Sequence, residues 1–452
     1  MKIVLYAHKW HYLDNYAPLA QELERRKIDF DALVLWPRND SYEKSKTKSG
    51  SRLIEPYYTK WGKFFASSTN AIPRLFRPTI RAIFFLYTLK KLFQKKCYKI
   101  LITSDDRAII HGIVMSAAKK AQLKTILYPS ESLNCVEDLV EDKLSVFREP
   151  TCLARAIAAI AMFIHPRNTI TAASGQKLHR YRPREVVELF FLNVLSWNPW
   201  IRGANKKTDV VAVNSKVQKD DDVLNGNQEK KMCVTGFLPY DKLWVYLQNK
   251  SGVQKRINRH FGTNPKKLFL IIGTHYNVAL YERREYPFLD AELNRVLKLF
   301  IETFGNDYNF VFKVHPQKPV AEQRENVDKD LRANILFAKN EYDTYELIAA
   351  SDAILNFFSS TIFAALATDS PIFCYYLFRK RPMMQKWLEK FHSVTYLRNL
   401  AETSKEISRM QDGTISKNLI QKYRQTDRDV AGKFDGKNTQ RFMALLNSLF
   451  DP

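Results

Sequence analysis

The sequence predicts an α/β protein with two domains, each built around a parallel sheet. Short apolar strands alternate with helical segments in both halves of the chain, a rhythm typical of parallel sheets covered by helices. The 452 residues exceed what a single hydrophobic core usually holds. Polar residues follow directly after several of the strands, at the ends where open α/β sheets bind their ligands.

In the first half, strands and helices alternate from the start of the chain. Strands are expected at residues 2–7, 30–36, 100–103 and 125–128, and helices at 18–26, 80–92 and 108–121. Residues 137–205 break this rhythm with long apolar runs, and we predict a helical insertion there. Strand character returns at 210–214 and 231–234.

The second half begins after a linker, which a polar helix and a Gly-Thr-Asn-Pro turn at 251–265 predict. Strands are expected at residues 268–272, 309–314, 334–337, 353–357 and 371–376, and helices at 289–304, 342–350, 361–366, 400–410 and 439–449. The predicted domains are therefore residues 1–250 and residues 251–435. A final helix in 436–452 is expected to cross back to the first domain.

The chain is strongly and unevenly basic, with 71 lysines and arginines against 47 acidic residues and a formal charge of +24. Between Glu55 and Asp105 there are ten basic residues, many large aromatic residues and no acid. A second acid-free stretch separates Glu149 from Glu185. Basic residues interleaved with aromatic rings suit an anionic membrane surface. The alternatives are nucleic acid, with bases stacked on the rings, and an ordinary core-facing helix with a basic outer side.

Three simpler observations narrow the class of protein. No run approaches the roughly 20 apolar residues that span a bilayer, so membrane contact is expected to be peripheral. The five cysteines are scattered without a CxxC pair, which indicates neither a zinc site nor a disulfide framework. The first residues do not form a signal peptide, and the cytoplasm is the expected location.

A His-Pro pair follows an apolar strand in the second half. Strand 309–314 leads to His315, and Pro316 forces extended backbone on the residue before it. An imidazolium at that strand end can bind phosphate oxygens and offset the charge on a departing nucleotide. The alternative is a chance pairing. A second pair, His165-Pro166, follows an apolar helical run, and we expect it to end that helix.

Two further segments after strands carry groups that can bind phosphate. Ser359 and Ser360 stand at the start of helix 361–366, where hydroxyls and free N–H groups can bind an anion without a metal. The alternative is a serine that only caps the helix. Gly273, Thr274 and His275 form the turn after strand 268–272 and can offer backbone N–H groups to donor phosphates.

These segments resemble one group of bacterial transferases. The block from 342 to 373, with Lys313-Val314-His315-Pro316 before it, is similar to the His-Pro-motif GT-B transferases of surface polysaccharide synthesis. That group includes the CDP-glycerol glycerophosphotransferases of teichoic acid, the capsule polysialyltransferases and the capsular Kdo transferases. The resemblance implies a GT-B fold, with two Rossmann-like domains facing a cleft, the donor on the second domain and the acceptor on the first.

The resemblance also implies that His315, Ser359 and Ser360 contact the nucleotide phosphate of the donor. One departure concerns the ribose. Many nucleotide-sugar enzymes of this architecture carry a glutamate in the helix after the serines, whereas here residues 362–366 read Ile-Phe-Ala-Ala-Leu. The identity of the donor therefore stays open.

Transfer to an acceptor hydroxyl requires a base, and a carboxylate or a histidine can serve. The candidates follow strands of the first domain: Glu131 ranks first, Asp106 second, and Asp14 and His11 after them. The structural alternatives are a helix cap for Asp14 and a surface ion pair with Arg107 for Asp106.

We therefore interpret the chain as a metal-independent GT-B glycosyltransferase that needs no cofactor besides its donor. The expected donor is a CMP- or UDP-linked sugar, and the expected acceptor is a surface-polysaccharide or lipid-linked saccharide, at the inner face of the cell membrane. The alternatives are a CDP-glycerol-type glycerophosphotransferase, an epimerase of the same architecture, a degenerate scaffold that binds a partner, and a basic nucleic-acid-binding protein. The last leaves the combination of His315 with two serines unexplained.

Overall fold

The structure is a computed structural model of the 452-residue chain. It describes residues 2–7, 13, 15–34, 52–54, 77–129, 152–171, 175, 177–261, 266–273, 289–314, 320–339, 341–357, 359–377, 391–411 and 416–449. The chain divides into two compact units. Unit 1 comprises Met1–Pro239 with Thr439–Pro452, and unit 2 comprises Tyr240–Asn438. Each unit contains one large parallel sheet, as the sequence predicts.

The sheet of unit 1 has seven strands in the order β3-β2-β1-β4-β5-β8-β9, and every neighbouring pair is parallel. The strands are β1 (Lys2–Ala7), β2 (Asp29–Val34), β3 (Arg52–Ile54), β4 (Ile100–Thr103), β5 (Lys124–Leu127), β8 (Val210–Val213) and β9 (Met232–Val234). All six strands predicted for this half are confirmed. The seventh, β3, lies at the edge of the sheet and was not predicted.

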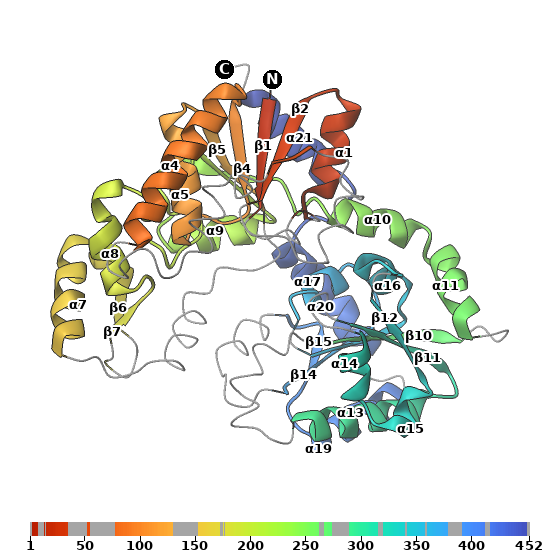
Figure 1. The fold of residues 1–452 in the computed structure, drawn as a ribbon. Helices are drawn as coiled ribbons and strands as arrows, with labels where there is room; N and C mark the ends of the chain where they lie inside the picture. The colour runs from red at the N-terminus through yellow and green to blue at the C-terminus, as the bar shows by residue number, and fades with distance from the viewer. Residues whose placement is uncertain are drawn as a thin grey trace. The chain divides into compact units, whose positions relative to one another are not determined.

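One face of this sheet is covered by α4 (Arg77–Lys95) and α5 (Ile109–Lys120) (Figure 1). The aromatic residues of α4 are mostly turned inward: Phe85 and Phe93 are buried, whereas Tyr87 is exposed. The burial of these two rings fits the alternative of a core-facing helix. Residues 55–76 of the same basic stretch lie outside the described residues.

The predicted helical insertion is only partly helical. It contains α7 (Cys152–Ile164), α8 (Pro183–Leu189) and two 3₁₀ turns, η3 (Pro166–Asn168) and η4 (Phe190–Leu192). Between η3 and α8, β6 (Thr169–Thr171) and β7 (Lys177–His179) form an antiparallel pair. The buried Asn168 side chain closes this pair, because its amide accepts from Tyr181 N at 2.8 Å and donates to Tyr181 O at 3.1 Å. The helix α7 ends at Ile164, directly before His165-Pro166, as predicted.

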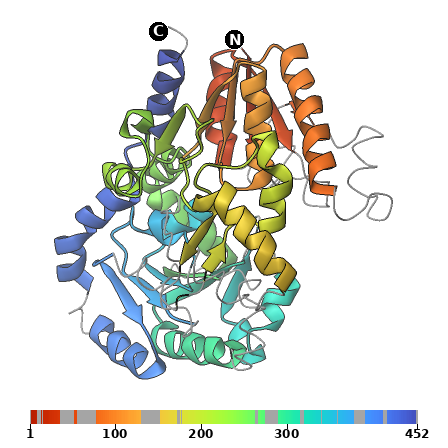
Figure 2. The same cartoon turned by 90° about the vertical axis from the view of Figure 1, so that its left-hand side faces the viewer.

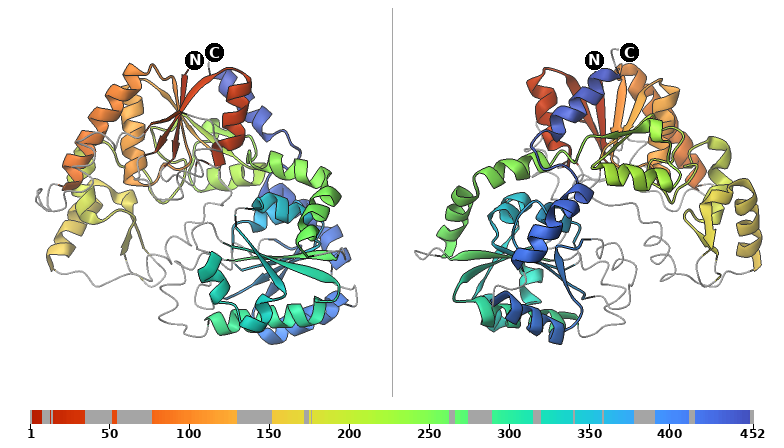
Figure 3. Two further views of the ribbon diagram at one scale, coloured as in Figure 1. Left: turned by 45° about the vertical axis from the view of Figure 1, so that its right-hand side comes forward. Right: turned by 180° about the vertical axis from the view of Figure 1, so that it is seen from behind.

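Unit 1 is completed by α1 (Ala17–Arg25), α9 (Lys216–Leu224), the turn η5 (Glu229–Lys231) and the final helix α21 (Asn438–Ser448). Figure 3 shows α21 beside the strands of this unit. The ring of Phe442 lies 5.4 Å from the ring of Tyr128, and Arg441 Nε donates to Thr235 O at 3.0 Å. The last helix therefore packs in the first unit.

The sheet of unit 2 has six parallel strands in the order β12-β11-β10-β13-β14-β15. Their bounds are β10 (Lys267–Ile272), β11 (Tyr308–Lys313), β12 (Ile335–Ala338), β13 (Ala353–Asn356), β14 (Ile372–Tyr375) and β15 (Val394–Leu397). The five strands predicted for this half are confirmed, and the edge strand β15 was not predicted.

Helices cover both faces of this second sheet (Figure 1). One layer contains α13 (Leu289–Phe304), α15 (Lys329–Arg332) and α19 (Leu400–Gln411), and α13 places Phe300 against Phe269 of β10. The other layer contains α10 (Tyr240–Gln248), α11 (Lys250–Asn258), α16 (Thr344–Ala350), α17 (Ile362–Ala365) and α20 (Ser416–Ala431). The short elements η6 (Arg259–Phe261) and α14 (Val320–Glu325) complete the unit.

The boundary between the units falls after Pro239, eleven residues before the predicted position at 250. The reason is that α10 packs on α16 of unit 2. The ring centroids of Tyr240 and Tyr345 lie 6.2 Å apart, and Lys242 Nζ lies 2.8 Å from the carboxylate of Asp343. In the described part of the chain, no helix combines the length and apolar character needed to cross a membrane.

Candidate functional site

The carboxyl ends of three strands meet at one edge of the unit 2 sheet. Here Gly273 N donates to Lys313 O at 3.4 Å, and Phe357 N donates to Ile272 O at 3.1 Å. The strands β11 and β13 are therefore the two neighbours of β10. Because adjacent strands lie about 4.8 Å apart, the carboxyl ends of β11 and β13 are about 10 Å from each other, on the same side of the sheet.

This edge is where the predicted donor residues are attached. His315 and Pro316 follow β11 by two and three residues, and Thr274 and His275 follow Gly273, but all four lie outside the described residues. Their contacts stay predictions. The topology brings the backbone on either side of them to one edge, which is the arrangement that a shared phosphate site requires.

Asn356, the last residue of β13, holds the serine turn in place. Its side chain is fully buried. The amide oxygen accepts from Ser359 N at 2.7 Å, and the amide nitrogen donates to Ser359 O at 3.2 Å. Sequence analysis missed this residue, because it treated Asn356 only as part of an apolar strand. A polar side chain at the carboxyl end of a buried strand was the available signal.

The helix after the serines offers fewer free N–H groups than the sequence predicts. Thr361 N approaches Ser359 Oγ at 3.4 Å, and the N–H groups of Ile362 and Phe363 donate to Ser359 O and Ser360 O, each at 3.1 Å. The helix α17 is also only four residues long. The Ser359 hydroxyl accepts from Thr361 Oγ1 at 2.9 Å, whereas Ser360 is exposed and its side chain bonds to none of the described residues.

Two residues near this edge are explained by packing. A Cβ on Gly273 would lie 2.7 Å from Phe312 Cε1, so the glycine allows the turn to pass the ring closely. The buried Lys313 donates from Nζ to Tyr342 O at 3.0 Å and also to Lys339 O. It ties the end of β11 to the loop after β12.

In unit 1 the structure places Asp106, one of the predicted bases, in a buried hydrogen-bond network. The side chain is fully buried, and it accepts from Gly203 N at 3.0 Å, Asn205 N at 3.3 Å and Thr208 Oγ1 at 3.1 Å. Burial, and then the negative charge of Asp105, raise its pKa above the ordinary value. A general base must reach the proton that it removes, and this carboxyl instead fastens the loop 203–208.

Asp105 is more accessible but is held as an anion. Its Oδ1 accepts from Arg107 Nε at 2.9 Å and from the N–H of Asp106 at 2.8 Å. Burial works against ionisation, but the charge of Arg107 and its neighbours outweighs it and keeps the pKa of Asp105 well below its usual range. Such a carboxylate is a weak base. Glu131, Asp14 and His11 lie outside the described residues, so Glu131 remains the predicted base.

A buried arginine connects the carboxyl ends of β4 and β5. Arg202 is 1% exposed and donates from Nε to Ser104 O at 3.3 Å and from Nη2 to Tyr128 O. Burial lowers the pKa of its guanidinium. The two carbonyl groups follow neighbouring strands, so Arg202 fixes the backbone at the carboxyl ends of β4 and β5.

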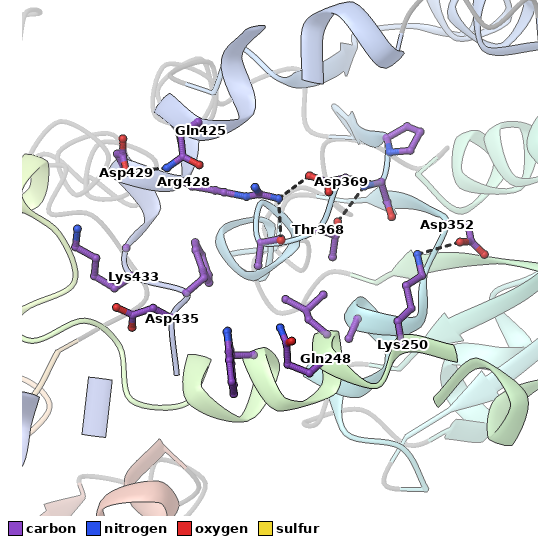
Figure 4. A pocket seen from close by; sticks show the side chains of 18 residues that line it. Gln248, Lys250, Asp352, Thr368, Asp369, Gln425, Arg428, Asp429, Lys433 and Asp435 are labelled. Atoms are coloured by element: carbon purple, nitrogen blue, oxygen red, sulfur yellow. Dashed lines mark hydrogen bonds and ion pairs between the residues drawn. The ribbon is translucent and has the colours of Figure 1, made fainter. Parts of the chain in front are cut away.

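Unit 2 also contains a hollow of about 840 Å³ that was not predicted (Figure 4). Asp352 and Pro371 in its lining precede β13 and β14, so it lies at the amino ends of the strands, opposite the donor edge. Its charges are largely paired: Arg428 lies 2.7 Å from Asp369, and Lys250 lies 3.0 Å from Asp352. These features do not fit a nucleotide phosphate. Within the described residues, no group of three or more His, Cys, Asp or Glu is arranged to hold a metal ion.

Comparison with known proteins places the chain in a family. The model of the CDP-glycerol:poly(glycerophosphate) glycerophosphotransferase family matches residues 205–447, more than half of the chain and all of unit 2. The chain belongs to this family. No curated protein sequence matches it. The family assignment makes the chain a transferase and agrees with the resemblance carried by the His-Pro and serine segments.

Solved structures of similar fold cover nearly the whole chain. A putative UDP-N-acetylglucosamine 2-epimerase from Listeria monocytogenes covers 100% of this chain and 97% of its own, with 14% identity and a TM-score of 0.58. UDP-GlcNAc 2-epimerase from Neisseria meningitidis, solved with UDP-GlcNAc bound, covers 100% of both chains with 11% identity and a TM-score of 0.55. A glycosyltransferase from Rickettsia africae covers 99% and 98%, with 10% identity and a TM-score of 0.51. At these identities the likeness shows the fold, which is GT-B with two Rossmann-like units.

Proposed function

We propose that the chain transfers a sugar from a CMP- or UDP-linked donor to a surface-polysaccharide or lipid-linked saccharide. The observation that carries the proposal is the carboxyl edge of the unit 2 sheet. There β11, which leads to His315, and the serine turn that Asn356 fixes flank β10, which ends directly before Gly273. Parallel α/β sheets bind nucleotides at this edge.

In the proposed reaction the acceptor oxygen forms a bond to the sugar carbon as the bond from that carbon to the donor phosphate breaks. The electron pair leaves with the nucleotide, and negative charge grows on its phosphate. His315 as an imidazolium, with the hydroxyls of Ser359 and Ser360, would stabilise that charge. The acceptor proton would pass to a base of unit 1, for which Glu131 is our candidate.

A CDP-glycerol-type reaction is the second candidate, because the matching family is described by that activity. There the acceptor would attack phosphorus instead of carbon, and CMP would leave. The nucleotide released during turnover distinguishes a UDP-sugar donor from CDP-glycerol. UDP indicates a UDP-sugar donor, whereas CMP from CDP-glycerol, with glycerol phosphate in the product, indicates the second candidate.

The experiment is a thermal-shift panel with CMP, CDP, UMP, UDP and GDP. We expect at least one nucleotide to raise the Tm of the wild type, and His315→Ala to abolish most of that rise. His260→Ala is the matched control, since His260 is an exposed histidine of unit 2 on η6. If no nucleotide stabilises the wild type, or if His315→Ala responds like His260→Ala, the donor site is wrong.

We also propose that the transfer requires no resident metal, because His315 and the serine hydroxyls would meet the phosphate charge directly. Activity with the stabilising donor should therefore be unchanged in excess EDTA. A loss of activity that added Mg²⁺ restores would show that a cation is needed. A lipid-linked acceptor further implies work at the inner face of the cell membrane, with the chain attached peripherally.

A further inference from the structure

The helix α7 presents an unusually apolar outer surface. Leu153, Ile160 and Phe163 are 72%, 52% and 88% exposed. Their spacing of seven and three residues places them on one face of the helix. Ala161 is the only residue of α7 that is buried, although twelve of its thirteen residues are uncharged. A surface helix of a water-soluble domain normally shows polar residues on this side.

More exposed aromatic residues lie in the same lobe, which consists of α7, η3, β6, β7, α8 and η4. Figure 1 shows this lobe at the margin of unit 1, with α7 outermost, and Figure 2 turns that side toward the viewer, so that α7 lies at the front. The helix α8 packs on α7, and η4 follows it with Phe191, which is 90% exposed. Trp197 lies near the end of α7, because Ser196, the residue before it, is bonded to His165, the residue after the helix: Ser196 O lies 2.8 Å from His165 Nε2.

Positive charge accompanies these apolar side chains. Residues 150–184 contain six lysines and arginines and no acid: Arg155, Arg167, Lys177, Arg180, Arg182 and Arg184. The exposed Arg167 and Lys206 lie over the ring of Trp197, at 4.8 Å and 3.8 Å from its centroid. Arg184 Nε lies 2.6 Å from the carboxylate of Glu188, so part of this charge is compensated.

The combination restricts the partner. Exposed aliphatic and aromatic side chains need an apolar phase, whereas the surrounding cations need anions, and the interface of an anionic bilayer provides both. A second copy of the chain would place two positive surfaces against each other. Nucleic acid would leave Leu153 and Ile160 without an apolar environment.

We propose that Leu153, Ile160, Phe163, Phe191 and Trp197 form a docking surface for an anionic membrane. This inference deepens the membrane attachment proposed above, and it does not depend on the donor chemistry. It places the contact on the lobe that contains the second acid-free stretch. Several lysines and arginines near an anionic bilayer, together with the inserted apolar side chains, give a measurable affinity.

The test is flotation of the full chain with vesicles of phosphatidylcholine alone or with added phosphatidylglycerol. We expect flotation with the anionic vesicles that weakens in high salt. Ile160→Ser/Phe163→Ser should reduce partitioning by about tenfold or more, since it removes two large apolar side chains. Leu224→Ser is the control, because Leu224 on α9 is 86% exposed but lies outside the lobe.

Three results would overturn the proposal. These are recovery of the wild type in the supernatant with anionic vesicles, equal flotation of the double variant and the wild type, and equal flotation with neutral and anionic vesicles. In the first case, a concentration-dependent dimer that the double variant cannot form would assign the surface to self-association. The nucleotide-induced Tm shift should be the same in the wild type and the double variant, which separates failure here from failure of the donor site and confirms that the variant is folded.

Discussion

At the scale of single residues, the structure shows that some side chains which the sequence does not single out fix the backbone of the site. Asn356 is the clearest case, because a buried amide fixes the backbone that carries Ser359. The sequence places both residues after the same strand, but it does not show which side chain turns back to bond the loop. Asp106 was singled out as a base, but the sequence does not show that it is bonded within a loop, because its partner Gly203 is 97 residues away along the chain.

Replacing Asn356 with alanine should weaken both the fold and nucleotide binding. The change leaves the N–H of Ser359 without its partner and removes one of the two donors to its C=O, at an expected cost of about 1–3 kcal/mol of unfolding free energy. The loosened turn should also reduce the nucleotide-induced Tm shift. Asn309→Ala is the matched control, because Asn309 donates a side-chain bond to Asn258 at 2.9 Å near the amino end of β11. A nucleotide shift that survives in Asn356→Ala would remove its positioning role.

Gly273→Ala should destabilise the chain through a single contact. The new methyl group would meet Phe312 Cε1 at 2.7 Å, and overpacking of this kind costs about 1–3 kcal/mol. Chemical denaturation of Gly273→Ala, Phe312→Leu and the double variant measures the coupling between the two sites. We expect the double variant to lose less than the sum of the single losses. Strict additivity would show that the ring does not exclude the side chain.

At the scale of elements, burial decided which strands could be predicted. The central strands β1, β4, β8, β10 and β13 are almost continuously buried, and their apolar runs are plain in the sequence. The edge strand β15 has only its first and last residues buried, so its pattern is weak. The pair β6–β7 was missed because it depends on Asn168, whose bonds reach Tyr181 across the turn.

The α7 lobe should lose stability as the pH falls below about 6.5. Burial lowers the pKa of His165 from 6.5, despite the nearby carbonyl of Ser196, and burial together with Lys177 lowers the pKa of His179. The unfolded chain then binds protons at a higher pH than the folded chain. The stabilisation is complete above the unfolded value of 6.5 and declines as the pH falls toward the folded values.

The measurement for this prediction is the Tm of the wild type and of His165→Gln/His179→Gln between pH 8 and about pH 5. The glutamines can keep a hydrogen bond to Ser196 O and to Thr169 Oγ1, but they do not titrate. The wild-type Tm should fall more steeply on the acid side. Parallel curves would show that neither histidine is linked to folding in this range.

At the scale of the whole molecule, the two-sheet architecture was predictable, and so was the position of Gly273 and Ser359 at the carboxyl ends of strands in unit 2. Both follow from alternating apolar segments and from the right-handed βαβ connections that make such sheets parallel. The boundary between the two units could not be predicted, because the residues that place α10 in unit 2, such as Lys242 and Asp343, are 101 positions apart. The catalytic base could not be singled out from the sequence either, because carboxyl groups that follow neighbouring strands differ in burial only after the chain has folded.

The donor edge can be tested most directly by a crystal structure of the wild type with the nucleotide that raises its Tm most. We predict that the phosphate lies at the carboxyl ends of β10, β11 and β13, within hydrogen-bond distance of His315 and of the Ser360 hydroxyl. A nucleotide found instead in the hollow lined by Lys250 and Arg428, at the opposite edge of the same sheet, would contradict the account.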